Sequence, residues 1–119
     1  MQIAYWIVAG IFAAFMLYGG GIKIIRSREQ LQPMMKWVDD MPAARVKLIG
    51  LIEVLGSIGL ILPPLLGIAP FLATAAAIGF VIMQVLAGLL HARRHESPGM
   101  NIALIVLAAV LVWLSTVWL

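Results

Sequence analysis

One acidic residue, Glu53, lies inside a long apolar stretch, LIGLIEVLGSIGL, which covers residues 48–60. An ionisable side chain within a membrane costs at least about 2.5–3.5 kcal/mol on insertion scales, and such residues usually face the interior of a helix bundle with a partner. Glu53 is therefore a candidate for ligand binding or proton transfer. The alternative is a structural hydrogen bond that ties its helix to Lys23, Gln84 or His91.

Further polar residues occur at matching depths in the neighbouring apolar stretches. Gln84 and His91 share one helix face, which places Gln84 about 10 Å inside the membrane end that His91 marks. Small residues on the face of Glu53, such as Gly50 and Gly56, leave room for a groove. The residues predicted to line a polar pocket are Glu53, Arg45, Lys23, Gln84, His91 and Asn101.

Several kinds of chemistry have no counterpart in the sequence. It contains no cysteine, which excludes disulfides, thiolate metal ligands and thiol nucleophiles. His91 and His95 have the i, i+4 spacing of a metal-binding pair, but no third ligand stands at a suitable spacing. No phosphate-binding glycine loop and no Ser/His/Asp set is recognisable. We therefore expect no catalytic residues, no metal and no cofactor within the chain itself, with a quinone as the one cofactor candidate.

The elements that must position these residues are membrane-spanning helices. Of the 119 residues, 64% are hydrophobic and 11% charged, against about 45–50% and 25% in soluble domains. Spanning the hydrocarbon takes roughly 20 apolar residues per helix. Within one domain, residues 1–119, we predict helices at 2–22, 43–62, 69–91 and 100–118, with Pro63 and Pro64 ending the second. The fold class is an all-α integral membrane four-helix bundle, with an amphipathic surface segment at 23–42.

Charge predicts the orientation of this bundle. Six of the eight Lys and Arg residues fall between Lys23 and Lys47, and the other two are Arg93 and Arg94. These loops lie on one side of a four-span bundle, so the positive-inside rule makes them cytoplasmic and places both termini on the outer face. The basic residues flank apolar spans, which favours the lipid bilayer as their partner and not nucleic acid.

The chain resembles the DoxX-like family of small four-helix membrane proteins over most of its length. The resemblance is carried by GGGIKI with Lys23, by WVDDMPAARVKLIGLIEVLGSIGLILPPLLGIAP with Arg45 and Glu53, by FLATAAAIGFVIMQVLAGLLHARRHE with His91, and by Asn101. It implies a four-helix bundle in the bacterial inner membrane. Relatives include a quinone-linked thiosulfate oxidoreductase subunit, a component of a mycobacterial oxidative-stress complex and an animal receptor-assembly chaperone.

Three functions are compatible with these features. The first is a non-catalytic accessory or binding protein, whose cytoplasm-facing pocket takes a quinone-like or lipid-like ligand or a partner helix. The second is a quinone-interacting subunit of a membrane oxidoreductase complex, in which His91 and Glu53 handle protons for a membrane or soluble partner. The third is an assembly chaperone for another membrane protein. None of the three requires an autonomous enzyme, and a homo-oligomer is compatible with each.

Overall fold

Four long helices make up most of the fold. The computed structural model describes the backbone of all 119 residues and the side chains of every residue except Arg28 and Asp40. The long helices are α1 (Gln2–Ile25), α3 (Ala43–Leu66), α4 (Leu72–Arg93) and α5 (Gly99–Leu114), the last extended by the 3-10 turn η2 (Ser115–Trp118). Each is long and apolar enough to cross a membrane when η2 is counted with α5. Because the described chain contains no strand, the predicted all-α four-helix fold is confirmed.

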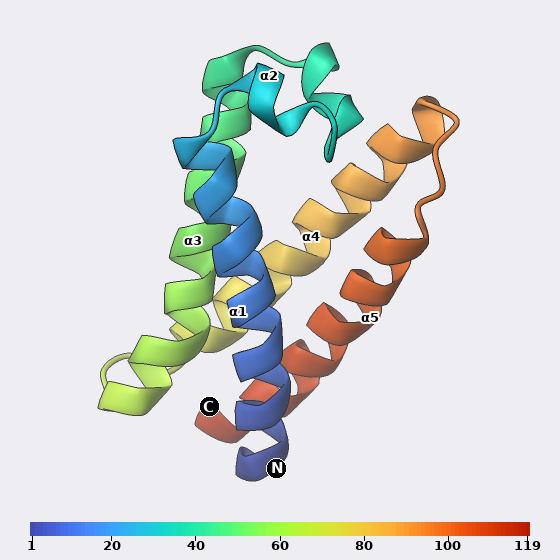
Figure 1. Ribbon diagram of the computed structural model, residues 1–119. Helices are drawn as coiled ribbons and strands as arrows, with labels where there is room; N and C mark the ends of the chain where they lie inside the picture. Colours follow the sequence, from blue (N-terminus) through green and yellow to red (C-terminus); the bar gives the residue numbers. More distant parts are fainter.

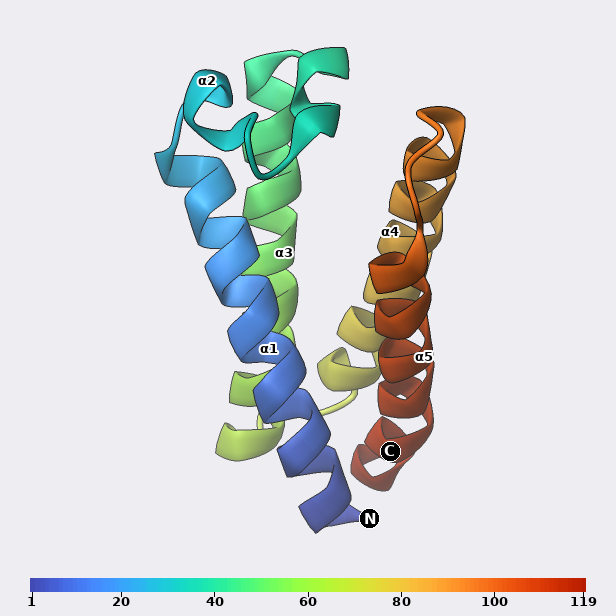
Figure 2. The same ribbon diagram turned by 45° about the vertical axis from the view of Figure 1, so that its right-hand side comes forward.

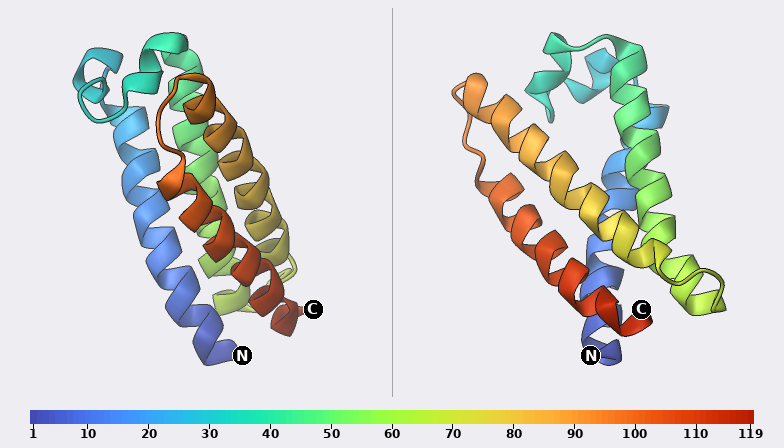
Figure 3. Two further views of the ribbon diagram at one scale, coloured as in Figure 1. Left: turned by 90° about the vertical axis from the view of Figure 1, so that its right-hand side faces the viewer. Right: turned by 180° about the vertical axis from the view of Figure 1, so that it is seen from behind.

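The helices form two antiparallel pairs, α1 with α3 and α4 with α5. Figures 1 and 2 show that the pairs converge at the end that holds both chain termini and diverge at the opposite end. The view from behind in Figure 3 shows the same divergence. The diverging end comprises residues 23–47 and 91–101. We call it the basic end, because Lys and Arg occur in no other part of the sequence.

The predicted surface segment folds over the basic end of the first helix pair (Figure 1). It contains the short helix α2 (Arg28–Leu31) and the 3-10 helix η1 (Lys36–Asp40). Its apolar side chains pack against the ends of α1 and α3 in a small cluster of buried residues, Ile22, Leu31, Val38 and Val46. The segment begins later than predicted, since α1 continues to Ile25.

The helix α3 also continues beyond its predicted end at Leu62, through Pro63 and Pro64 to Leu66. A proline removes one backbone donor, and a membrane helix tolerates this when another group satisfies the freed carbonyl. The residue that ends the helix is Gly67, which adopts the left-handed conformation with φ of 70°. The N–H groups of Gly67 and Ile68 both donate to the Pro63 carbonyl. The stop signal is therefore a glycine cap and not the proline pair.

A tyrosine supplies the donor that one of these prolines lacks. Pro64 has no N–H, so the carbonyl of Leu60, four residues earlier, receives no helical hydrogen bond from it. The hydroxyl of Tyr5 donates to this carbonyl over 2.6 Å, and both residues are fully buried. The proline in α3 thus creates the acceptor through which α1 is attached to α3.

Removing this hydroxyl tests the link. We expect Tyr5→Phe to lower the free energy of unfolding by about 1–2 kcal/mol, because a buried carbonyl loses a donor that no water replaces. The measurement is reversible unfolding in mixed micelles. Tyr18→Phe is the matched control, since Tyr18 is 59% exposed on the same helix, and it should change stability by less than about 0.5 kcal/mol. Equal effects of the two variants would contradict the assignment.

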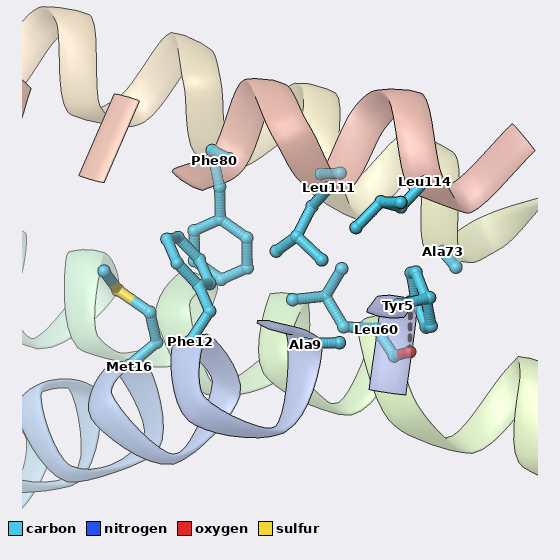
Figure 4. Close-up of a cluster of buried hydrophobic side chains, with 11 residues drawn as sticks. Tyr5, Ala9, Phe12, Met16, Leu60, Ala73, Phe80, Leu111 and Leu114 are labelled. Atoms are coloured by element: carbon cyan, nitrogen blue, oxygen red, sulfur yellow. Dashed lines mark hydrogen bonds between the residues drawn. The ribbon is translucent and has the colours of Figure 1, made fainter. Parts of the chain in front are cut away.

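The main hydrophobic core lies where the two pairs converge (Figure 4). Phe12 of α1 and Phe80 of α4 meet edge to face, with ring centroids 5.0 Å apart and ring planes at 77°. Gly56 of α3 makes room for this contact, because a Cβ atom there would lie 2.7 Å from Cζ of Phe80. This core joins all four long helices. It does not extend to the basic end, where the two helix pairs lie apart.

Candidate functional site

Glu53 and Lys23 form a buried ion pair between α3 and α1. Nζ of Lys23 donates to Oε1 of Glu53, and the two side chains are 12% and 5% exposed. The sequence left Lys23, Gln84 and His91 as possible partners of Glu53, and in the structure the partner is Lys23. A charged pair removed from water in this way needs close geometry to compensate for its lost hydration.

The direction of helical side chains explains why two residues at different depths meet. Lys23 lies in the last turn of α1, whereas Glu53 lies ten residues into α3, about 15 Å along its axis. Side chains lean toward the N-terminus of their own helix. Because the helices are antiparallel, Lys23 leans toward the middle of the bundle and Glu53 leans toward the basic end. The two side chains therefore approach each other.

Two facing glycines bring the helix backbones together beside this pair. A Cβ atom on Gly20 would lie 2.7 Å from the carbonyl oxygen of Gly50, and one on Gly50 would lie 2.6 Å from the carbonyl oxygen of Gly20. Either contact is too short for any side chain, so only glycine permits this crossing. A Cβ atom on Gly19 would lie 3.7 Å from Oε2 of Glu53, which places this carboxylate against the glycine run of α1.

Trp37 covers the lysine from the connecting segment. The centroid of its ring lies 5.5 Å from Nζ of Lys23, within the range of cation–π attraction. Trp37 packs against the small buried cluster at the basic end. The segment between α1 and α3 therefore shields the ion pair from water as well as connecting the helices.

A cleft of about 550 Å³ opens beside the ion pair, between the end of α1, the helix α2 and the start of α3. Its lining residues are Lys23, Ile25, Arg26, Ser27, Glu29, Leu31, Ala43, Val46 and Lys47. This volume falls in the range of about 300–1,000 Å³ that is usual for small-molecule sites. A smaller, apolar cleft of about 320 Å³ lies between α3 and α4, and its lining contains no titratable side chain.

Two further predicted residues meet on the second helix pair. Nδ2 of Asn101 donates to Oε1 of Gln84 over 2.9 Å, which joins α5 to α4. Gln84 is 5% exposed. Among the described side chains, no hydrogen bond or ion pair connects this amide pair to Lys23 or Glu53. A single pocket lined by all the predicted residues therefore stays a prediction.

His91 belongs to a polar contact in the loop after α4. Its Nδ1 lies 3.2 Å from Oε1 of Glu96, and Nε of Arg94 donates to the same oxygen over 2.9 Å. Partial desolvation acts to raise the pKa of Glu96, but the hydrogen bonds from Arg94 and His91 outweigh it and lower the pKa below its ordinary value. Glu96 therefore stays ionised to a lower pH than a free glutamate, and its charge holds the loop against the end of α4.

Arg45 lies apart from these contacts. It is exposed in the first turn of α3 and does not line the cleft beside Lys23. Within the described part of the chain, no three His, Cys, Asp or Glu side chains come close enough to hold a metal ion. The residues that could hold a small molecule are those of the cleft.

Three residues of the site were not predicted from the sequence. Arg26 and Lys47 line the same cleft as Lys23, and the ring of Trp37 lies over its Nζ. The sequence indicated only general anchoring at the membrane surface for such side chains. A usable signal was present: the segment after α1 carries apolar residues between its charges, which indicates that it packs back onto the helices. The facing positions of Gly20 and Gly50 could not be read from either helix alone.

The fold and the site together define a class, the small multi-pass α-helical membrane proteins with a buried ion pair between their first two spans. The sequence model of the DoxX-like family matches residues 7–115. The chain therefore belongs to the DoxX-like family. Comparison with curated proteins and with solved structures finds no match.

Proposed function

We propose that this DoxX-like protein is a non-catalytic binding protein of the bacterial inner membrane. It holds the polar head of a small amphipathic molecule, quinone-like or lipid-like, at its basic end. The positive-inside rule supports a cytoplasmic basic end and termini on the outer face, because Lys and Arg are confined to the loops of that end.

The observation that carries this proposal is the position of Lys23 in the wall of the cleft while its charge is balanced by Glu53. A lysine ammonium has three donors, and Glu53 takes one of them. Trp37 covers another side of the ammonium, and a remaining donor can reach an oxygen atom of a ligand in the cleft. Ile25, which also lines the cleft, is 82% exposed and offers an apolar surface next to these donors. An amphipathic molecule matches this combination.

The quinone-linked enzyme subunit is less well supported. It requires His91 and Glu53 to exchange protons with one ligand. His91 contacts Glu96 and Glu53 contacts Lys23, so these contacts place the two residues on different helix pairs. The site could instead bind a helix of a partner protein, as in an assembly chaperone. A membrane protein would then copurify in stoichiometric amount in place of the small molecule.

Ligand retention tests the proposal. The full chain is purified from its native membrane in mild detergent, and native mass spectrometry identifies what it carries. We expect the wild type to retain an amphipathic molecule and the double variant Lys23→Met/Glu53→Leu to lose it. The double variant removes both charges and so leaves no buried ion unpaired. Lys36→Met is the control, because Lys36 is exposed in the same segment and outside the cleft.

Two results would overturn the proposal. One is a wild type that carries no small molecule under any extraction condition. The other is equal retention by the wild type and the folded double variant. Capture of one stoichiometric membrane protein in place of a small molecule would favour the assembly-chaperone alternative.

A further inference from the structure

The cleft beside the ion pair carries more positive than negative charge. Its charged lining residues are Lys23, Arg26, Lys47 and Glu29. Lys23 is neutralised by Glu53, so two cations face one carboxylate. An anion in the cleft would restore the balance.

The two remaining cations have no anionic partner among the described side chains. Nη1 of Arg26 contacts Sδ of Met34 at 3.7 Å, and Nζ of Lys47 donates to the backbone carbonyl of Ile24 over 2.6 Å. These are weak or neutral acceptors, and each side chain keeps further donors. Arginine and lysine donors gathered at one level are the groups that bind phosphate oxygens.

The position of the cleft restricts the source of the phosphate. It lies at the boundary between the apolar length of α1 and α3 and the charged connecting segment. Ile25 in its lining is 82% exposed, and Leu48, the residue after Lys47, is 54% exposed. Cations therefore stand next to exposed apolar side chains, which suit contact with hydrocarbon. Basic pockets of this kind, on the positive side of a membrane protein, suit phospholipid head groups.

We propose that the cleft binds the head group of an anionic phospholipid. Arg26 and Lys47 contact the phosphate, while the acyl chains lie along the exposed apolar side chains of α1 and α3. This inference rests on the proposed function and narrows its ligand to one class. A quinone has an uncharged head and gains nothing from the excess positive charge of the lining.

Binding of defined lipids to the full chain in detergent tests this assignment, with native mass spectrometry as the readout. We expect phosphatidylglycerol to bind at least about ten-fold more tightly than phosphatidylcholine, since charged hydrogen bonds contribute most to such a difference. The preference should weaken as salt is raised. Glycerol 3-phosphate and inorganic phosphate test whether the cleft binds a free anion. Both should bind more weakly than the lipid because they lack acyl chains.

Three variants locate the site. Arg26→Gln/Lys47→Gln should bring phosphatidylglycerol down to the affinity of phosphatidylcholine, and Lys36→Gln, in the same segment but outside the cleft, should change nothing. Glu29→Gln should bind phosphatidylglycerol more tightly than the wild type, because it removes the one carboxylate of the lining. This gain stays measurable even if the double variant does not fold.

Three outcomes would overturn the inference. The first is equal affinity for the two lipids, and the second is that neither Arg26→Gln/Lys47→Gln nor Glu29→Gln changes lipid binding. The third is a free anion that binds as tightly as the lipid.

Suppose that the protein shows no preference for phosphatidylglycerol while the Lys23→Met/Glu53→Leu variant still loses the molecule that the wild type retains. In that case the inference fails and the proposed function stands. If the preference depends on Arg26 and Lys47 and yet the Lys23→Met/Glu53→Leu variant keeps its ligand, the Lys23 site of the proposed function fails.

Discussion

Replacing Glu53 with leucine is expected to lower the free energy of unfolding by about 3–5 kcal/mol, because it leaves Lys23 as a buried charge with no counter-charge. The lysine side chain is only 12% exposed, so the little water that reaches it compensates for only part of the lost carboxylate. The measurement is reversible unfolding in mixed micelles, followed by circular dichroism. Asp39→Leu is the matched control, since Asp39 is exposed on η1 and does not line the cleft.

A double-mutant cycle separates the ion pair from general damage to the helix. Lys23→Met should also destabilise the protein, whereas Lys23→Met/Glu53→Leu should be more stable than the sum of the single effects predicts. Groups in direct contact show coupling energies of about 0.5–3 kcal/mol in such cycles. Additive effects of the two single variants would mean that the side chains do not interact in the membrane protein.

Replacing Gly50 with valine is expected to separate α1 from α3, with a loss of stability at the upper end of the roughly 1–3 kcal/mol that overpacking costs. A Cβ atom there would lie 2.6 Å from the Gly20 carbonyl oxygen and 2.8 Å from Cβ of Lys23. The first of these is backbone and cannot turn aside. The new side chain must also displace the lysine, so this variant should lose ligand retention together with stability.

Gly10→Val provides the control for the glycine prediction. A Cβ atom on Gly10 meets nothing within 4 Å, and this residue lies on the same helix as Gly20. The same change in helix propensity therefore occurs without a clash. Thermal unfolding of both variants, measured in one detergent, makes the comparison. Equal midpoints would show that α1 and α3 do not cross as closely as the facing glycines indicate.

Much of the fold could be predicted from the sequence, because the hydrocarbon thickness imposes a length on every span. The long apolar runs, together with charged residues that are confined to the loops between them, were enough to predict four helices and the segment between the first two. The predicted end of α3 was wrong for a local reason. Prolines end helices in water, but Pro64 lies where Tyr5 can satisfy the carbonyl that it frees, and neither residue alone reveals that contact.

The site was predictable only in part. Counting residues along the spans gave the depth of Glu53 and of Gln84, but depth does not determine which helices meet. The pairing of Lys23 with Glu53 depends on the glycine crossing of α1 and α3, and the pairing of Gln84 with Asn101 depends on α4 and α5 forming a separate pair. Because the pairs diverge at the basic end (Figure 2), residues at similar depth belong to separate contacts.

The most direct test of the binding site is a crystal structure grown from a lipidic mesophase that contains phosphatidylglycerol and a quinone. We predict density for an amphipathic molecule in the cleft between α1, α2 and α3, with its head next to Lys23 and with Lys23 still paired to Glu53. An empty cleft at this lipid content, or Lys23 turned away from Glu53, would contradict it.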